Sequence, residues 1–201
     1  PLLLANPKTG LSKDTLDEIG RVAKNLSKKT VYIVGGENSV PASVEKQLKD
    51  KFGVTVVRVA GLDRTATSLE VAKRLKYNGH NANDVFFVGA NGAADAMSVS
   101  AVAARKDAAG KVSPIIVMKK DDFDRTTREF LNGTNKAYIV GGTDSVSSLG
   151  YKAVKNIASV TTLERLSGAD RYATNVEVVN KFYKHKDNSA GIDAKGVVFA
   201  S

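Results

Sequence analysis

A ten-residue motif with two arginines, an aspartate, a glycine and a threonine occurs twice in this chain. The sequence reads RVAGLDRTAT at residues 58–67 and RLSGADRYAT at residues 165–174. A guanidinium group can bind a carboxylate or a phosphate through two parallel hydrogen bonds. The motif therefore predicts either ion pairs that lock each strand–helix corner or a repeated site for phosphate or carboxylate groups. The residue types alone favour the structural interpretation.

The remaining repeated positions of this motif have expected roles of their own. Asp63 and Asp170 each stand at the start of a predicted helix, where an aspartate side chain can cap the first turn. We assign the motif's glycines to the structure and its threonines to ligand binding. The candidate residues therefore also include Gly61, Gly168, Thr67 and Thr174.

A pair of glycines ends a predicted strand in each copy, in VYIVGG at residues 31–36 and AYIVGG at residues 137–142. Glycine permits a positive φ and close approach of a backbone or ligand. The glycines are Gly35, Gly36, Gly141 and Gly142. They form either a tight structural turn or an anion contact at a helix N-terminus. We favour the turn, because both copies lack the G-x-G-x-x-G and P-loop patterns of phosphate sites. Ser39 and Ser145 follow, and we expect them to cap the next helices.

Residues suited to catalysis or metal binding are scarce. The chain has no cysteine, which excludes disulfides, thiolate metal sites and a cysteine nucleophile. Its two histidines, His80 and His185, lie in or beside predicted linkers, without a nucleophile in a recognisable pattern around them. We therefore expect a binding protein, with no catalytic residue, metal site or cofactor.

The elements that carry these motifs alternate between strand and helix. Short apolar runs predict strands at residues 2–4, 32–34, 54–59, 85–89, 115–118, 138–140 and 160–166. Apolar residues at helical spacing predict helices at residues 16–26, 43–52, 68–75 and 122–131, and along three further stripes. These stripes are Met97, Ala101 and Ala104; Val146, Leu149, Ala153 and Ile157; and Val176, Val179 and Tyr183. Such alternation predicts an α/β fold with parallel sheets flanked by helices.

The two copies of the arginine motif begin 107 residues apart, at residues 58 and 165, which is the size of a small domain. The repeat reaches both ends of the chain, because residues 1–4 resemble 114–117 and residues 84–88 resemble 196–200. We expect a module at residues 1–79 that lacks its opening strand and helix, a complete module at 82–186, and the first strand of a third at 195–201. This pattern is expected for part of a longer region with at least three modules.

The composition is basic, with a formal net charge of +9 and an isoelectric point of about 9.6. A basic surface favours polyanionic partners, although scattered lysines can also serve solubility alone. The chain has no tryptophan and no aromatic-rich nucleic-acid motif, so we expect no nucleic-acid partner. It has no apolar run of the roughly 20 residues that a membrane helix needs.

Together these segments resemble the cell wall binding repeat 2 family of Gram-positive surface proteins, best known in clostridia. The similarity covers essentially the whole chain. It rests on VFFVG at residues 85–89 followed by Asp95 and Ala96, on the proline-led strands, on the YIVGG strand ends and on RLSGADRYAT. The first copy departs from this pattern with Leu62 and Thr65 where the second has Ala169 and Tyr172, so a role for that tyrosine ring does not transfer to the first module.

This resemblance implies Rossmann-like or toprim-like modules, with pseudo-threefold symmetry when three are present. It also implies a secreted protein that is anchored non-covalently to the cell wall through an anionic, phosphate-bearing polysaccharide. Neighbouring modules and other S-layer subunits are further expected partners. In this hypothesis the arginines neutralise polymer phosphates, and the glycine turns and proline-led strands shape the groove. The arginines concerned are Arg58, Arg64, Arg165 and Arg171.

Two alternatives remain open at this point. The modules could tile a surface lattice through protein contacts and touch no glycan. Less favoured is a Rossmann-type enzyme that binds a nucleotide or nucleotide sugar, since this would need a complete glycine fingerprint and an acidic residue for the ribose.

Overall fold

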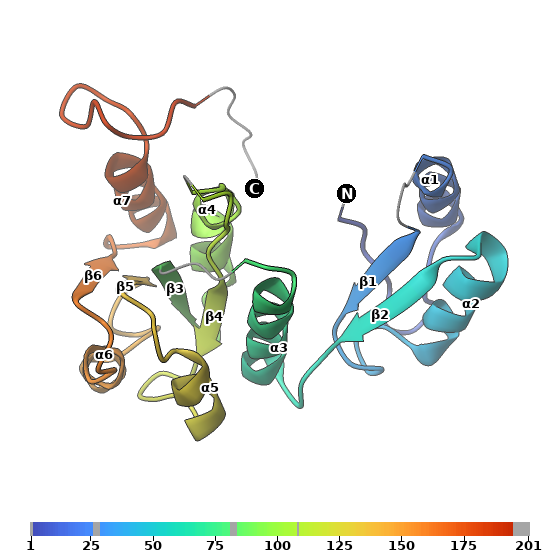
Figure 1. Ribbon diagram of the computed structural model, residues 1–201, viewed down its shortest axis with the longest axis horizontal. Helices are drawn as coiled ribbons and strands as arrows, with labels where there is room; N and C mark the ends of the chain where they lie inside the picture. Colours follow the sequence, from blue (N-terminus) through green and yellow to red (C-terminus); the bar gives the residue numbers. More distant parts are fainter. Residues whose placement is uncertain (1, 26–28, 81–83, 108, 195–201) are drawn as a thin grey trace. The chain divides into compact units, whose positions relative to one another are not determined.

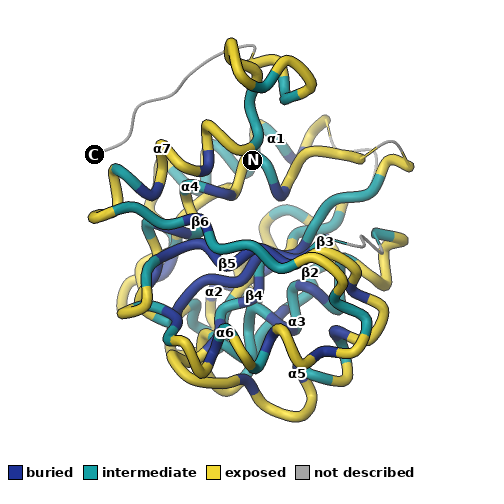
Figure 2. Tube along the Cα trace, turned by 90° about the vertical axis from the view of Figure 1, so that its left-hand side faces the viewer, coloured by how far each residue is buried: buried dark blue, intermediate teal, exposed yellow. Residues whose placement is uncertain are grey.

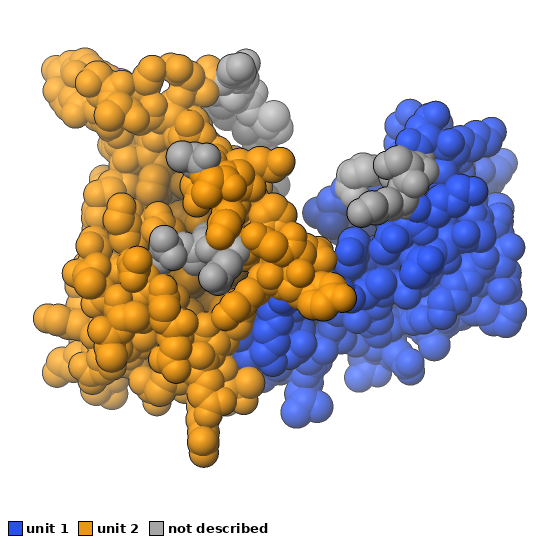
Figure 3. Space-filling view, in the orientation of Figure 1, with its two compact units in different colours: residues 1–74 blue, residues 75–201 orange. Residues whose placement is uncertain are grey.

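The computed structural model describes residues 2–25, 29–80, 84–107 and 109–194. The chain divides into two compact units, residues 1–74 (unit 1) and residues 75–201 (unit 2) (Figure 3). The strand expected at residues 195–201 lies outside the described residues.

Unit 2 contains a four-stranded parallel sheet with the spatial order β4-β3-β5-β6 (Figure 1). Its strands are β3 (Asp84–Gly89), β4 (Ile115–Met118), β5 (Lys136–Val140) and β6 (Thr162–Leu166). In the central strand, Phe86 pairs with Ile115 on one side and with Tyr138 on the other. Residues Val85 to Gly89 are all buried, as expected for a parallel strand that is covered on both faces.

Two helices cover each face of this sheet. α4 (Ala93–Ala103) and α7 (Arg171–Phe182) lie on one face, and α5 (Arg125–Phe130) and α6 (Ser148–Lys155) lie on the other (Figures 1 and 2). The chain therefore runs from β3 through α4 to β4, and then through α5 past β3 to β5. The carboxyl ends of β3 and β5 thus form the point where the strand order reverses, which is where ligands bind in open α/β sheets.

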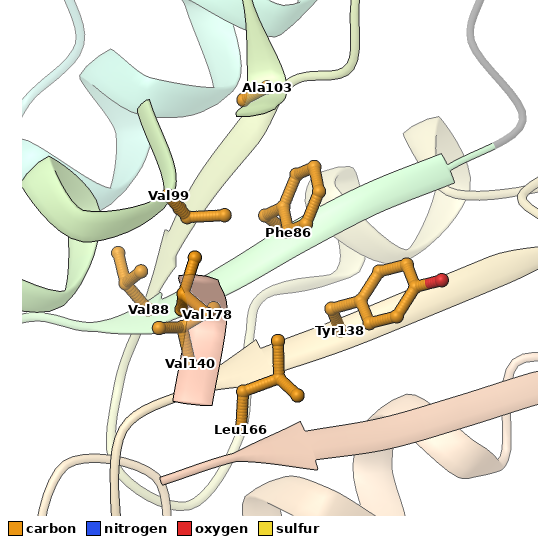
Figure 4. Close-up of a cluster of buried hydrophobic side chains, with 8 residues drawn as sticks. All are labelled: Phe86, Val88, Val99, Ala103, Tyr138, Val140, Leu166 and Val178. Carbon is orange, nitrogen blue, oxygen red and sulfur yellow. The ribbon is translucent and has the colours of Figure 1, made fainter. Parts of the chain in front are cut away.

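Alternate residues of each strand supply the core on each face of the sheet. On the face of α4 and α7, Phe86 stacks on Tyr138 with ring centroids 5.3 Å apart. The buried cluster there consists of Phe86, Val88, Val99, Ala103, Tyr138, Val140, Leu166 and Val178 (Figure 4). On the opposite face Phe87 stacks on Phe123, with centroids 6.1 Å apart. Each fully buried side chain of this size stabilises the fold by about 1.5–3 kcal/mol.

Unit 1 contains a smaller, two-stranded parallel sheet of β1 (Thr30–Val34) and β2 (Thr55–Val59). Its helices are α1 (Lys13–Ala23), α2 (Ala42–Phe52) and α3 (Arg64–Tyr77), of which the last residues of α3 belong to unit 2. The core between α1, α2 and the strands contains Ala23, Ile33, Val44, Leu48 and Val54. On β1, Tyr32 and Val34 are 48% and 54% exposed. Their counterparts in unit 2, Tyr138 and Val140, are buried with α4 and α7, and the described part of unit 1 has no counterpart of α4.

The strand predicted at residues 2–4 is wrong. Leu2 and Leu4 are 87% and 83% exposed, and the segment has no regular structure. The corresponding strand of unit 2, β4, is held by its pairing with β3. Among the described residues, unit 1 has no strand that corresponds to β3, so the segment has no partner with which to pair.

The apolar stripes predicted for α4 and α7 do not face the core. Met97, Val176 and Val179 are 64%, 53% and 44% exposed, whereas Val99 and Val178 are fully buried. Both helices have apolar residues on more than one face, so the spacing of these residues was compatible with two orientations of each helix toward the core. The other predicted helices and strands are present with shifted ends; for example, α3 begins at residue 64 rather than 68. None of the helices among the described residues has the length and apolar character that a membrane crossing requires.

Candidate functional site

The arginine motif forms the same strand–helix corner in both units. The Asp170 carboxylate accepts a hydrogen bond from the Ala173 amide at 2.8 Å and caps α7. Asp63 accepts the Ala66 amide at the start of α3, also at 2.8 Å. The prediction that both aspartates cap helices is therefore confirmed, and such a cap contributes about 1 kcal/mol.

The motif's glycine and threonine close the corner from the other side. The Gly168 amide donates to the Thr174 hydroxyl, and the Gly61 amide donates to the Thr67 hydroxyl, each at 3.0 Å. A Cβ at Gly168 would lie 2.5 Å from the carbonyl carbon of Ala173, so no larger residue fits there without displacing the helix. The two threonines, which were predicted to bind ligand, thus have hydrogen-bond partners within the chain.

The first arginine of each motif braces the glycine turn. Arg165 donates to the carbonyl oxygens of Gly141 and Val146, both at 2.7 Å. In unit 1, Arg58 donates to the equivalent carbonyls of Gly35 and Val40, both at 2.9 Å. The braced turns need glycine at their first position, because Gly35 and Gly141 have φ values of +123° and +114°.

The surroundings of this brace differ between the units. Arg58 has a side chain that is 17% exposed, and it pairs with Glu45 across 3.3 Å. Tyr151 stands near the corresponding place in unit 2, where the Arg165 guanidinium lies 5.7 Å from the centre of its ring. Burial lowers the pKa of Arg165, and the nearby Tyr151 partly offsets this. One arginine is therefore neutralised by a carboxylate, whereas the other rests on an aromatic ring.

The second arginine of each motif lies on the surface. Arg171 and Arg64 are the first residues of α7 and α3, and both are exposed. Asp170 and Asp63, beside them, are also exposed while their carboxylates cap the helices. Of the four candidate arginines, these two are placed to meet a ligand from solvent.

Asp95 links the turns at the carboxyl edge of the unit 2 sheet. It lies in the first turn of α4, is 7% exposed, and accepts a hydrogen bond from the Ser145 side chain. Its Oδ2 lies 2.5 Å and 2.9 Å from the positions that a Cβ would take at Gly141 and Gly92. Bare glycine backbone on two turns is therefore what leaves room for this carboxylate.

The electrostatics of Asp95 reflect this burial. Desolvation raises the pKa of the Asp95 carboxyl, while the Ser145 hydrogen bond and the charge of Arg171 act in the opposite direction. The sequence singled out Asp95 only within the segment that follows residues 85–89 and named no partner for it. Its neighbours Ser145 and Arg171 lie 50 and 76 positions further on, and no local pattern connects residues at such separations.

The capping roles predicted for Ser39 and Ser145 are wrong. Pro41 stands at the start of α2 without a side-chain cap, and Ser147 caps α6. Ser145 belongs to the turn before the helix, where it binds Asp95. Among the remaining predicted residues, Gly36 and Gly142 have room for a Cβ, since nothing lies within 4 Å of that position.

The described residues contain no group of three or more histidine or acidic side chains that could hold a metal ion. The strand–helix corner of each motif displays one exposed arginine, and a helix cap and hydrogen bonds hold this corner in place. Such an arrangement can bind an anionic group.

Comparison with known proteins shows what this chain is similar to. Residues 58–149 match the cell wall binding domain 2 family. Cwp8 from Clostridium difficile is structurally similar, with a TM-score of 0.79 and 42% identity over 91% of this chain and 29% of Cwp8. Cwp6 from the same organism gives a TM-score of 0.76 and 31% identity over 90% of this chain and 27% of Cwp6. An uncharacterised protein of Pyrococcus abyssi is 34% identical over 83 residues, which are 39% of this chain and 23% of that protein.

These matches confirm the resemblance seen in the sequence and the α/β fold with parallel sheets flanked by helices. The chain spans less than a third of the length of each relative. The matched family is a binding domain rather than a catalytic one, and a domain that binds the cell wall implies a location at the cell surface. Residues 58–149 of this chain are therefore similar to a cell wall binding domain 2, and most of the chain is similar in structure to Cwp8 and Cwp6.

Proposed function

We propose that this chain anchors a surface protein non-covalently to the cell wall by binding an anionic, phosphate-bearing wall polysaccharide. The observation that carries the proposal is the contrast between the two arginines of the repeated motif. In both units the first arginine is engaged by backbone carbonyls, whereas the second, Arg64 or Arg171, is exposed on a rigid corner.

In this proposal some residues contact the polymer, and others form a frame that holds the contact residues in position. Arg64 and Arg171 contact the polymer phosphates. The frame holds these contacts in place and consists of Arg58, Arg165, Thr67, Thr174, Gly35, Gly36, Gly141 and Gly142. A phosphodiester polymer presents the same charge at regular intervals, so two modest sites on one chain act together with a raised effective concentration. The net charge of +9 supports a polyanionic partner.

Neighbouring modules of the same protein are the second proposed partner, and the exposed face of α7 is where they dock. Tyr172, Val176 and Val179 are 76%, 53% and 44% exposed along this helix. In α3, the counterparts of the last two residues are Leu69 and Ala72, which are only 3% and 1% exposed. Because these exposed apolar side chains lie on one face of α7, at positions 172, 176 and 179, we expect a further module to cover them.

The experiment is sedimentation of this chain with purified cell walls of the source organism at low and high salt. Half of the walls are first stripped of phosphodiester-linked polymer with hydrofluoric acid. We expect binding to intact walls that weakens steeply with salt, because exposed charges are screened, and that is lost on stripped walls.

Other outcomes separate the competing functions. Binding that survives stripping would identify another wall component, such as peptidoglycan, and would contradict the phosphate-bearing partner. Absence of binding to either preparation would favour a lattice of surface-protein contacts without a glycan. The nucleotide-sugar enzyme remains without support, since both glycine turns lack the fingerprint of such sites.

A further inference from the structure

The sheet of unit 1 has a free edge along β1. In unit 2 the equivalent strand, β5, pairs with β3 on one side and with β6 on the other. In unit 1, β1 pairs with β2 (Figure 1), and no second strand pairs with it among the described residues. The other edge of β1 therefore presents backbone amides and carbonyls that can pair with a further strand.

Apolar side chains are exposed at the same place in the repeat. In unit 2, β3 lies between β4 and β5, and the counterparts of these two strands in unit 1 are residues 2–4 and β1. The exposed apolar residues of unit 1 thus correspond to residues that flank β3 in unit 2. They are Leu2, Leu4, Tyr32 and Val34. Unit 1 has an acceptor for a strand of the β3 type.

A segment with the pattern of β3 occurs a second time in the chain. Residues 196–200 read GVVFA and resemble DVFFV at residues 84–88. They lie outside the described residues. In this alignment Val198 takes the place of Phe86, which is part of the buried cluster of unit 2. Consecutive apolar residues of this kind suit a parallel strand that is covered on both faces.

We propose that residues 196–200 of a second copy of this chain add to β1 as a parallel strand, in the register that β3 has with β5. In this register Val198 lies opposite Tyr32. Ala200 likewise lies opposite Val34. Main-chain hydrogen bonds supply the affinity of such strand addition, and alternate side chains supply its specificity. The contact is head-to-tail, so copies can join into longer assemblies. It is independent of wall binding.

A short tether favours a second copy over the same chain. The segment after α7 is tied back on itself, because a backbone bridge joins Tyr183 to Ile192 and Lys184 pairs with Asp193 across 3.0 Å. Only residues 194–195 separate this segment from the proposed strand. Such a tether reaches an edge of its own chain in few orientations, whereas a second copy can approach in the orientation that the pairing requires.

The test is disulfide formation between copies, for which the chain offers a clean background because it has no cysteine. Val34→Cys is mixed with Ala200→Cys in a glutathione buffer, and the disulfide-linked heterodimer is measured. Neighbouring strands lie about 4.8 Å apart, which is within the Cα separation that a disulfide spans. The matched control mixes Val34→Cys with Val197→Cys, since Val197 is out of register and on the opposite face of the proposed strand.

We expect the first mixture to form heterodimer at least about tenfold faster than the control, because strand pairing raises the effective concentration of the two thiols. Val34 is 54% exposed, so its replacement leaves the core of unit 1 unchanged. Equal rates in the two mixtures would overturn the proposal. It would also be wrong if the double variant Val34→Cys, Ala200→Cys closed its disulfide within one copy in preference to joining copies.

Sedimentation velocity gives a second measurement without substitutions. We expect the average mass of the chain to rise with concentration, and the mass of a shortened chain that ends at residue 194 to stay constant. The shortened chain keeps every described residue, so its fold is the internal control and is checked by circular dichroism. The same concentration dependence in both chains would contradict the role of residues 196–200.

Discussion

Replacing Arg165 by methionine tests the division between frame and contact residues. The change removes two hydrogen bonds of 2.7 Å to the carbonyl oxygens of Gly141 and Val146, both of which belong to buried residues. Each buried carbonyl left without a partner costs about 1–3 kcal/mol, so we expect the free energy of unfolding to fall by about 2–6 kcal/mol. Methionine keeps the apolar stem of the side chain. Arg171→Met removes an exposed side chain and is expected to change stability by no more than about 0.5 kcal/mol.

The assay is urea denaturation of both variants and the unaltered chain, followed by circular dichroism. With a slope of about 2 kcal/mol per molar urea, the Arg165→Met midpoint of unit 2 should fall by about 1–3 M. Amide hydrogen exchange of residues 141–146 should accelerate in the same variant, because the turn loses its brace. Equal midpoints for Arg165→Met and Arg171→Met would refute the assignment of Arg165 to the frame.

Three smaller predictions concern the corner itself, and all are measured by the same denaturation experiment. Gly168→Ala should destabilise unit 2 by about 2–4 kcal/mol, since its Cβ would collide with the backbone of Ala173. Gly142→Ala is the control, because its Cβ would meet nothing within 4 Å, and its free energy of unfolding should stay near that of the unaltered chain. Thr174→Val should cost about 1–2 kcal/mol by leaving the Gly168 amide without its acceptor, whereas a serine at this position should retain most of the stability. Asp170→Ala should cost about 1 kcal/mol through loss of the α7 cap, and similar losses for alanine and asparagine at this position would contradict the capping role.

Local sequence patterns predicted most of the fold because they depend on neighbouring residues. The aspartates of the motif could be recognised as helix caps. Apolar runs located the strands to within about two residues, and in the case of residues 115–118 with the correct bounds. The strand predicted at residues 2–4 is wrong because strand formation there depends on residues far away in the sequence. Its composition is that of a strand, but a strand also needs a partner, and residues 2–4 pair with none in the structure.

The orientation of the helices was harder to predict. In α4, alanines and other small residues surround the helix, so the stripe through Met97 looked as apolar as the stripe through Val99 that faces the core. The orientation of the arginines in the site was equally hard to predict. Arg58 and Arg64 have the same side chain and stand six positions apart, yet one is turned toward backbone carbonyls and the other toward solvent. Spacing alone gave them equal weight as ligand contacts.

The contact to Asp95 illustrates what long-range structure adds. Its pairing with Ser145 depends on the crossing of the chain past β3, which brings the turns after β3 and β5 together. The sequence placed both residues close to their strands but gave no reason to join them. Hydrogen bonds within a turn leave a local pattern in the sequence, whereas contacts across a parallel sheet do not.

In the proposed function Arg64 and Arg171, and not the positive charge as a whole, hold the wall polymer. The most direct measurement is a binding isotherm of the double variant Arg64→Met, Arg171→Met on intact walls, beside a control in which the exposed Arg105 and Arg125 are changed to methionine. Both variants lose two positive charges. Our account predicts that affinity falls at least tenfold in the first variant, as expected for the loss of two charge-assisted contacts, and remains near the unaltered value in the second. Equal affinities for the two variants would contradict the account.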